Sequence, residues 1–431
     1  VPRRRTPAGD SPDGSRRLEG APRSRVAPAA GVVTQGRIVP GTAAYRRVTL
    51  AMFLAGLATF ALLYATQALL PLIAEEYDAS SSQTGLTVSS ATGALALAIL
   101  PLSALSERWG RARVMVISLV VAGVLGLGAA LAPTLSVLVL LRALQGLALA
   151  GVPAVAIAYL GERVDPAALG QAVGSYVAGN AIGGLAGRLV PSVVADLAGW
   201  RIGVASLAAG TLLVTLALYR TMPARDRQPG RREHTHSVPL RLLVTVSGRH
   251  LADPRLRGLY VLAFCCMGSF VALYNYVGFR LVAPPYDVRP AVVGLVYLSY
   301  VAGSASSAVA GRLADAWGRR RVLLGGLAVF CAGVALTLPT PFPVVLSGLV
   351  VATTGFFAVH ATASGWVAKR ATHARAHASA LYLLAYYTGS SVLGWALGLP
   401  FEYAGWGWLV GCVLAILSVA TAVAVRLGRS A

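Results

Sequence analysis

The chain has 431 residues, of which 56% are hydrophobic and 12% are charged. A soluble globular protein carries about a quarter charged residues, so this composition excludes an ordinary soluble domain and indicates a protein built for lipid. The formal net charge is +21, and all but one of the 37 basic residues are arginine. Because a nucleic-acid-binding protein can also carry such a charge, the distribution of the arginines decides what the charge means.

The chain begins with a stretch, residues 1–47, that is rich in Arg, Pro, Gly and Ala, and we expect it to be a disordered tail. Twelve apolar spans follow, each near the ~20 residues that cross a bilayer as a helix. Their approximate limits are 48–73, 84–105, 113–132, 135–158, 171–194, 201–221, 257–282, 291–311, 321–339, 343–366, 378–400 and 405–426.

A polar segment, residues 223–256, separates the sixth span from the seventh. The sequence therefore predicts an all-α membrane protein with twelve transmembrane helices in two six-helix halves. We expect the halves to be 48–222 and 257–427, joined by the polar segment as a linker and followed by a short tail, 428–431.

The basic residues predict the orientation of these helices. If the N-terminus is cytosolic, the cytosolic segments hold 32 Lys and Arg residues and the opposite loops hold three, Arg201, Arg280 and Arg289. Loops rich in Lys and Arg stay in the cytosol. We therefore expect a multi-pass protein of the cytoplasmic membrane with both termini in the cytosol, and the arginines need no nucleic-acid partner.

The two halves repeat one charged loop. The segment from Gly311 to Arg321 contains Asp315 followed by Trp-Gly-Arg, and the segment from Ser103 to Arg113 contains Glu107 followed by Trp-Gly-Arg. Both copies stand between the second and third spans of their half. Glycine permits close approach of two helices at Gly311 and a reversal of the backbone at Gly318.

This loop resembles the signature of the major facilitator superfamily, G-x-L-a-D-r-x-G-R-R, with Ser103 and Glu107 as departures in the first copy. The resemblance implies two pseudo-symmetric halves that rock about a central solute site, lined by spans one, four and seven. It also implies that the loops latch the halves on the cytosolic face. The latch candidates are Glu107, Arg108, Gly110, Arg111, Gly311, Asp315, Gly318 and Arg319.

Two further stretches carry the resemblance. Span four contains Arg142 and Gly146 in the family's R-x-x-q-G pattern, and span five resembles the glycine motif of drug:proton antiporters, with Ser175 and Asn180 departing from it. Span five and span seven together are similar to the YnfM-type branch of inner-membrane transporters. The glycines are equally typical of close helix packing.

Polar residues within the spans are the candidates for the solute cavity. Tyr64, Gln67, Arg142, Arg188 and Asn275 all fall in the outer half of the bilayer by helical rise. The full set of cavity candidates is Tyr64, Gln67, Arg142, Asn180, Tyr274, Asn275, Tyr297, Tyr300, Tyr382 and Tyr386. For each tyrosine, packing or interfacial placement is the alternative.

Arg142 leads to a specific hypothesis about the solute. Its charge needs compensation within the membrane, which an anionic or zwitterionic solute would provide through charge-assisted hydrogen bonds. Alternatively, Arg142 hydrogen-bonds backbone carbonyls or reaches Glu75 or Glu76, and supports the fold.

None of the sixteen acidic residues lies deep in a span, so a proton-coupled carrier would need another titratable group there. His360 in span ten has a suitable unperturbed pKa, near 6.5, and is the main proton-relay candidate beside Arg142. A hydrogen-bonded structural histidine is the alternative. Glu75, Glu76 and Asp196 at the span ends are possible relays or arginine partners.

The sequence thus predicts a secondary transporter that moves a small organic solute, coupled to an ion, with a proton as the expected ion. Efflux of drug-like compounds and carriage of a metabolite remain alternatives. We expect a functional monomer with no cofactor, no metal and no enzymatic activity, because there is no nucleotide-binding loop and no metal-ligand spacing. A membrane-embedded enzyme or a non-transporting sensor would need features that the sequence lacks.

Overall fold

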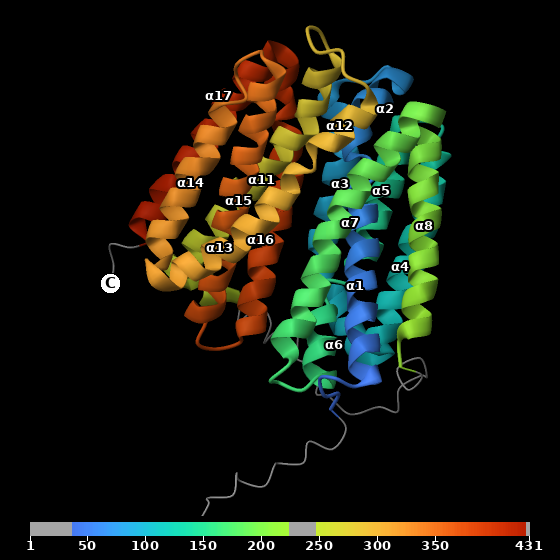
Figure 1. The fold of residues 1–431 in the computed structure, drawn as a ribbon, viewed down its shortest axis with the longest axis vertical. Helices are drawn as coiled ribbons and strands as arrows, with labels where there is room; N and C mark the ends of the chain where they lie inside the picture. Colours follow the sequence, from blue (N-terminus) through green and yellow to red (C-terminus); the bar gives the residue numbers. More distant parts are fainter. Residues whose placement is uncertain (1–36, 224–246, 428–431) are drawn as a thin grey trace, which may run out of the picture. The chain divides into compact units, whose positions relative to one another are not determined.

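The computed structural model describes residues 37–223 and 247–427, and the residues from Ile38 onward belong to one compact unit (Figure 1). The expected tail up to residue 36, most of the expected linker and residues 428–431 lie outside the described residues. Within the described ranges the chain is helical apart from turns, loops and a single β-bridge between Ile38 and Val164.

We call the elements before the linker the N-terminal half. They are α1 Ala43–Leu63, η1 Gln67–Leu69, α2 Leu70–Tyr77, α3 Ser81–Trp109, α4 Arg111–Ala130, α5 Leu135–Leu149, α6 Ala156–Arg163, α7 Leu169–Ala198 and α8 Trp200–Thr221. The C-terminal half comprises α11 Pro254–Val282, α12 Pro290–Val296, α13 Ser299–Ala316, α14 Arg319–Ala335, α15 Phe342–Arg370, α16 Arg375–Ala396 and α17 Gly398–Arg426.

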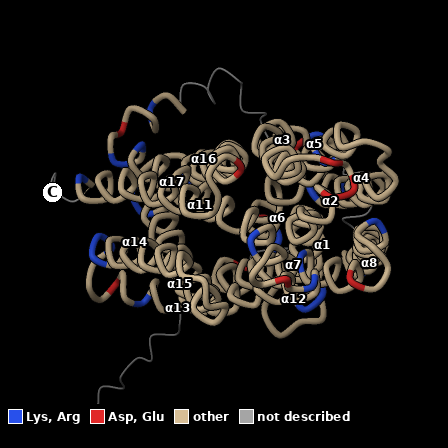
Figure 2. The backbone as a smooth tube through the Cα atoms, turned by 90° about the horizontal axis from the view of Figure 1, so that it is seen from above, with Lys and Arg blue, Asp and Glu red and all other residues tan. Residues whose placement is uncertain are grey.

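The twelve predicted spans correspond to these helices. In the described part, nine segments are long and apolar enough to cross a membrane when α1 to α2 and α12 to α13 are each taken as one. Helices α5, α14 and α16 supply the other three. Seen from above, α14 lies toward one edge and α4 and α8 lie toward the other (Figure 2).

Three spans that the sequence predicts as continuous are interrupted. The first breaks between α1 and η1, the fourth ends as α5 at Leu149 before α6 begins, and the eighth breaks between α12 and α13. In the fourth span, Gly151 and Pro153 explain the break, because proline lacks the N–H that the helix needs. Interrupted helices matter here because they leave backbone carbonyls free for other partners.

The repeated loop has the same backbone conformation in both halves. Gly110 and Gly318 each join two helices with φ of +88° and +85°, in the left-handed region that favours glycine. The prediction that Gly318 reverses the chain is therefore confirmed. Gly199 and Gly405 repeat this pattern between the last two spans of each half, with φ of +85° and +76°.

Helices α1 and α7 pack through glycines at four-residue spacing. A side chain at any of these glycines would overlap a backbone carbonyl of α1; the pairs are Gly179 with Phe53, Gly183 with Leu57 and Gly187 with Ala61. This is the close packing through small residues that membrane helices use. This packing fixes the position of the turn of α7 that begins directly after Gly187.

The two halves meet mainly at one end. Helix α7 contacts α12, α3 contacts α16, and η1 and α2 contact α11. Since α2 and α12 lie at the same end (Figure 1), we call it the α2 end, and the opposite end, which carries the repeated loops, the loop end. The structure is thus closed at the α2 end.

Candidate solute site between the two halves

The break in the first span provides the partners for Arg142. Helix α1 ends at Leu63, and the carbonyl oxygens of its last turn carry partial negative charge and have room for further hydrogen-bond donors. Arg142 donates hydrogen bonds to the carbonyl oxygens of Leu62 at 2.8 Å, Thr87 at 3.0 Å and Leu63. The guanidinium therefore caps a helix end.

Arg142 is built into the N-terminal half. It is 1% exposed, and it also donates to the side chain of Gln145, whose amide donates to the Ala122 carbonyl at 2.8 Å. In the described ranges no carboxylate pairs with Arg142; Glu76 pairs instead with Arg201 at 2.8 Å. This geometry matches the alternative interpretation of Arg142, in which it supports the fold.

A second buried arginine, Arg188, lies among aromatic rings contributed by both halves. Its guanidinium carbon is 4.0 Å from the ring centroid of Tyr64, 5.0 Å from that of Tyr297 and 4.7 Å from that of Tyr300. Arg188 is 2% exposed, and none of the described carboxylates pairs with it, including Asp196. We call these four residues the arginine cage.

The arginine cage is linked to α11 by a hydrogen bond between two residues that occupy equivalent positions in the two halves. Arg188 Nε donates to Gln67 Oε1 at 2.7 Å, and Gln67 Nε2 donates to Asn275 Oδ1 at 2.7 Å. Gln67 and Asn275 are 208 residues apart, as are Glu107 and Asp315 in the repeated loops. Equivalent residues of two halves meet where the pseudo-two-fold axis passes, so this bond marks the centre of the interface.

The tyrosines of the C-terminal half fall into two groups. Tyr274 anchors the half from within, because its hydroxyl lies 2.5 Å from Ser299 Oγ and 2.6 Å from Thr353 Oγ1. Tyr297 donates to the Tyr274 carbonyl at 3.1 Å, and its ring faces the guanidinium of Arg188. Tyr300 is half-buried, and its ring packs against Phe270 and Phe357 and lies 4.7 Å from the Arg188 guanidinium carbon.

A continuous aromatic cluster connects Tyr300 to His360. The ring centroids of Tyr300 and Phe270 are 5.5 Å apart, those of Phe270 and Phe356 are 3.9 Å apart, and those of Phe356 and His360 are 6.1 Å apart. His360, like Tyr300, is half-buried. Such rings contact each other favourably and offer an apolar wall to a solute.

His360 has hydrogen-bonding and ring contacts with the two tyrosines of α16. Its Nδ1 lies 3.1 Å from the Tyr382 hydroxyl, and its ring centroid lies 4.7 Å from that of Tyr386. These three residues, with Cys266 and Phe356, surround a crevice of the C-terminal half that is too small to admit a water molecule. The structure therefore brings the predicted relay residue together with two of the predicted cavity tyrosines.

Asn180 is placed apart from the cage. It faces Gly56 across the α1–α7 contact, so its neighbours belong to the N-terminal half. Its Oδ1 is buried and has no hydrogen-bond partner in the described part of the chain. Asn180 therefore belongs to the packing contact between α1 and α7. It lies four residues after Tyr176 along α7.

The repeated loops make ion pairs only within their own halves in the described ranges. Arg111 pairs with Glu162 at 2.7 Å, and Asp315 pairs with Lys369 at 3.3 Å and Arg319 at 3.8 Å. Within the described ranges, the exposed residues Glu107 and Arg108 form no ion pair, and a side chain at Gly311 would meet no neighbouring atom within 4 Å.

The expectation that Gly311 permits a close helix contact is therefore wrong in this state. Its missing side chain faces open space among the described residues, since the two halves contact each other mainly at the α2 end. A close approach at Gly311 would require the halves to meet at the loop end.

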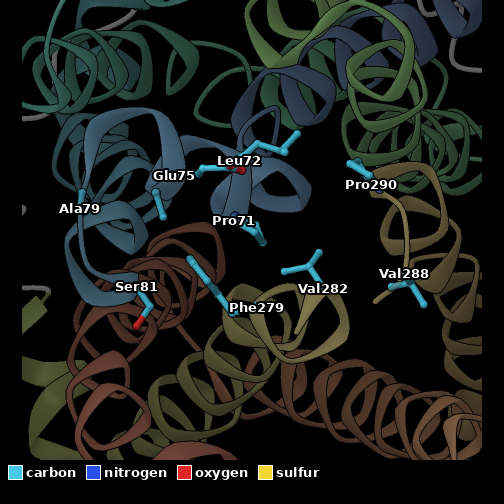
Figure 3. Close-up of a pocket in the computed structure, with 10 residues that line it drawn as sticks. Pro71, Leu72, Glu75, Ala79, Ser81, Phe279, Val282, Val288 and Pro290 are labelled. Atoms are coloured by element: carbon cyan, nitrogen blue, oxygen red, sulfur yellow. The ribbon is translucent and has the colours of Figure 1, made fainter. Parts of the chain in front are cut away.

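A separate cavity opens between the halves at the α2 end (Figure 3). Its volume is about 570 Å³, and its walls are mostly apolar, with Pro71 and Leu72 of α2 facing Phe279 and Val282 of α11. Glu75 is its one acidic lining residue, and it forms no ion pair within the described ranges. This hollow lies on the far side of the Gln67–Asn275 bond from the loop end.

Sequence reasoning placed Arg188 within a span but did not select it for the site. The signal that could have found it is its position directly after Gly187, because the α1–α7 packing aims the next residue at the end of α1. Predicting this required knowledge that α1 ends at Leu63, which the apolar pattern of the span conceals.

Two six-helix halves with a buried polar site between them define a membrane carrier. The family model of the Major Facilitator Superfamily matches residues 48–287. The chain belongs to this superfamily, and it is a multi-pass membrane transporter rather than an enzyme.

Two bacterial transporters match this chain over nearly its whole length. The MFS-type transporter YybF of Bacillus subtilis (strain 168) is 36% identical over 394 residues, covering 90% of this chain and 95% of the relative. The inner membrane transport protein YnfM of Escherichia coli (strain K12) is 36% identical over 391 residues, covering 90% and 92%. The predicted resemblance to the YnfM-type branch is confirmed.

Solved transporter structures share the fold. A bacterial homolog of the human lysosomal transporter Spinster has a TM-score of 0.76 at 18% identity, covering 90% of this chain and 97% of that chain. The nucleoside transporter NupG has a TM-score of 0.71 at 15% identity, covering 90% and 100%. These likenesses confirm the twelve-helix architecture and concern the fold alone.

Proposed function

We propose that this transporter carries a small organic acid, a carboxylate on an apolar or aromatic body, and that Arg188 binds the carboxylate. The observation behind the proposal is a buried arginine, ringed by tyrosines of both halves, that no described carboxylate neutralises. A charge within a membrane protein is costly unless it is paired, and such residues mark solute pathways. Arginine binds a carboxylate through two parallel hydrogen bonds.

The contrast between the two buried arginines supports this assignment. Arg142 has three carbonyl oxygens and one amide oxygen as partners, all from the N-terminal half. Arg188 has the Gln67 oxygen, the Gly184 carbonyl and the Tyr300 side chain as partners, one fewer than Arg142, and ring faces lie around its guanidinium. Arg188 therefore keeps donor capacity for a solute, and the anion hypothesis moves from Arg142 to Arg188.

The aromatic surroundings favour a solute with an apolar body. Half-buried Tyr300 and His360 stand at the two ends of the aromatic cluster, which begins beside the guanidinium. A carboxylate held at Arg188 would place its body along these rings. Tyr386 completes this surface next to His360.

Proton coupling is part of the proposal, with His360 as the proton-binding group. The acids of the described ranges lie in loops or near helix ends, whereas His360 lies within α15 and next to the proposed solute path. Imidazole changes its charge near neutral pH. Protonation of His360 would favour a nearby anion, and this attraction would couple proton and solute.

The excess of basic residues at the loop end supports a cytosolic position of that end and of both termini. The structure, closed at the α2 end, would then correspond to a carrier that is sealed on the outside. The proposed setting is the cytoplasmic membrane, with a single chain forming the whole site.

Efflux of drug-like compounds is the second candidate, and the aromatic cluster favours it because apolar compounds bind such rings without a charge. The two candidates differ in their dependence on Arg188. An organic acid requires its guanidinium, whereas an uncharged or cationic compound does not.

Three probes of one shape separate the candidates: benzoate, benzamide and benzylamine. Thermal unfolding of the purified protein would be followed with increasing concentrations of each, because a ligand that binds the folded state raises the midpoint. We expect benzoate alone to stabilise the protein, with the effect weakened in Arg188→Lys and lost in Arg188→Gln.

The matched control is Arg201→Gln. Arg201 also lies over aromatic rings, 4.7 Å from the Trp200 centroid, but sits at the α2 end. It should leave the benzoate effect intact. Stabilisation by benzamide or benzylamine that persists in Arg188→Gln would contradict the proposal and favour drug efflux.

A further inference from the structure

A chain of three hydrogen bonds runs from the arginine cage into the C-terminal half. Arg188 Nε donates to Gln67, Gln67 donates to Asn275, and Asn275 Nδ2 donates to the Gly394 carbonyl at 3.1 Å. Gln67, Asn275 and Arg188 are 2%, 0% and 2% exposed. The chain is therefore shielded from water, where hydrogen bonds are strongest and broken ones are most costly.

The Gln67–Asn275 bond is special among the contacts between the halves. It joins two side chains at equivalent positions of the two halves, whereas the bond from Ser391 Oγ to the Ser89 carbonyl, at 2.7 Å, ends on backbone. The bond lies next to the cavity at the α2 end, since Pro71 of α2 packs near Gly278 of α11. It therefore lies at the end where the two halves meet.

The chemistry of Gln67 ties this bond to the cage. An amide accepts at its oxygen and donates at its nitrogen, and Gln67 uses the oxygen for Arg188 and the nitrogen for Asn275. The Arg188 bond thereby fixes which side of the amide faces Asn275. If the oxygen were released, the amide would be free to turn, and its donor would no longer be held toward Asn275.

The Gln67 oxygen occupies the place that a solute carboxylate would take. It sits 2.7 Å from Arg188 Nε, and the edge formed by Nε and one terminal nitrogen is one of the two that bind a carboxylate bidentately. Resting on the proposed function above, we propose that the solute carboxylate displaces Gln67 from Arg188 and so releases the Gln67–Asn275 bond, which opens the α2 end. Gln67 is then an internal stand-in for the solute.

This proposal predicts opposite binding behaviour for two variants of one residue. Gln67→Leu removes both hydrogen bonds and leaves Arg188 free. Gln67→Glu places a permanent carboxylate on Arg188 but has no donor for Asn275, whose oxygen then faces another acceptor. Both variants should weaken closure at the α2 end, and only the glutamate should block the cage.

The experiment measures the distance across the α2 end in purified full-length protein. Spin labels would be attached at Ala79→Cys and Val288→Cys, which lie on opposite sides of the cavity (Figure 3), in a background with the four native cysteines replaced. Distances would be recorded by double electron–electron resonance with and without benzoate. Gln83→Leu is the matched control: this exposed glutamine at the start of α3 is not part of the three-bond chain, and its side-chain oxygen accepts only a local bond from the Ser80 N–H at 3.0 Å.

In the parent and in Gln83→Leu we expect a short distance that lengthens on addition of benzoate. Gln67→Leu and Gln67→Glu should show the long distance without benzoate. Benzoate affinity should rise about threefold or more in Gln67→Leu, because a competing internal group is gone, and should be lost in Gln67→Glu. If Gln67→Leu fails to fold, Gln67→Ala replaces it, because alanine also removes both hydrogen bonds and has a smaller side chain.

Two results would overturn the inference while leaving the proposed function standing: benzoate binding that depends on Arg188 without any lengthening of the distance, or a short distance in ligand-free Gln67→Leu and Gln67→Glu. Absence of benzoate binding in parent and Gln67→Leu alike, with opening still seen in both Gln67 variants, would instead reject the proposed solute and with it the displacement step.

Discussion

Two buried arginines in one half illustrate how the surroundings of a residue determine its role. Arg142 and Arg188 look alike in the sequence, since each is a lone charge in an apolar span. The structure separates them by their partners: Arg142 meets the carbonyls at the end of α1, and Arg188 meets the rings of the cage. The sequence identified both residues but concealed the helix break that distinguishes them.

Arg142→Gln should therefore affect the stability of the fold more than solute binding. The change leaves the carbonyls of Leu62 and Leu63 without their charged partner, which costs about 1–3 kcal/mol for a buried polar group. We expect a lower unfolding midpoint with the benzoate effect retained, measured by thermal unfolding of the purified protein. A normal midpoint with no response to benzoate would return the anion site to Arg142.

His360→Gln should uncouple protons from transport without abolishing solute binding. Glutamine can still hydrogen-bond the Tyr382 hydroxyl, 3.1 Å from the imidazole in the parent, but does not titrate. Benzoate affinity measured across the pH range should therefore lose the part of its dependence on pH that comes from the imidazole. His377→Gln, at the start of α16, should keep the parent profile, and an unchanged profile in His360→Gln would exclude His360 as the coupling group.

At the scale of helices, the sequence predicted the spans well and their interruptions poorly. The length of an apolar segment decides whether it crosses the membrane, and this length can be counted directly in the sequence. The breaks after Leu63 and between α12 and α13 have no proline at the break itself, so their cause is tertiary: Arg142 takes the carbonyls of one. The tyrosines of the cage lie at these breaks. Because the breaks were not predicted, the sequence could not show which of the cavity candidates lie next to each other.

The α1–α7 contact gives a prediction with a control in the same helix. Gly183→Ala places a methyl group against the Leu57 backbone, and overpacking of this kind typically costs about 1–3 kcal/mol. Gly174→Ala faces no described atom within 4 Å and should be neutral or slightly stabilising, because alanine favours helix. Thermal unfolding of both variants tests this, and equal midpoints would argue against tight packing at Gly183.

At the scale of the whole molecule, the internal repeat connects the loops to the site. The same spacing of 208 residues relates Glu107 to Asp315 and Gln67 to Asn275, and the second pair meets between the halves. The repeated loops were evident from sequence because they carry charge, whereas the Gln67–Asn275 pair was not, because a pairing across two halves requires their relative position.

Asp315→Asn should slow the exchange between states and leave binding almost unchanged. Asp315 is exposed, and its pairs with Lys369 and Arg319 lie within one half, so they contribute little to stability. We expect the acid to act when the loop end closes. Benzoate affinity within about threefold of the parent, with slower solute exchange in liposomes, is the expected result; lost affinity with normal exchange would contradict it.

The central claim is that a solute carboxylate binds at Arg188 between the two halves. It is tested most directly by equilibrium binding of radiolabelled benzoate to the purified full-length protein. The parent and Arg142→Lys should show saturable binding that unlabelled benzoate displaces and benzamide does not, and Arg188→Gln should show none. Binding of parental affinity in Arg188→Gln, or equal displacement by benzamide, would contradict the account.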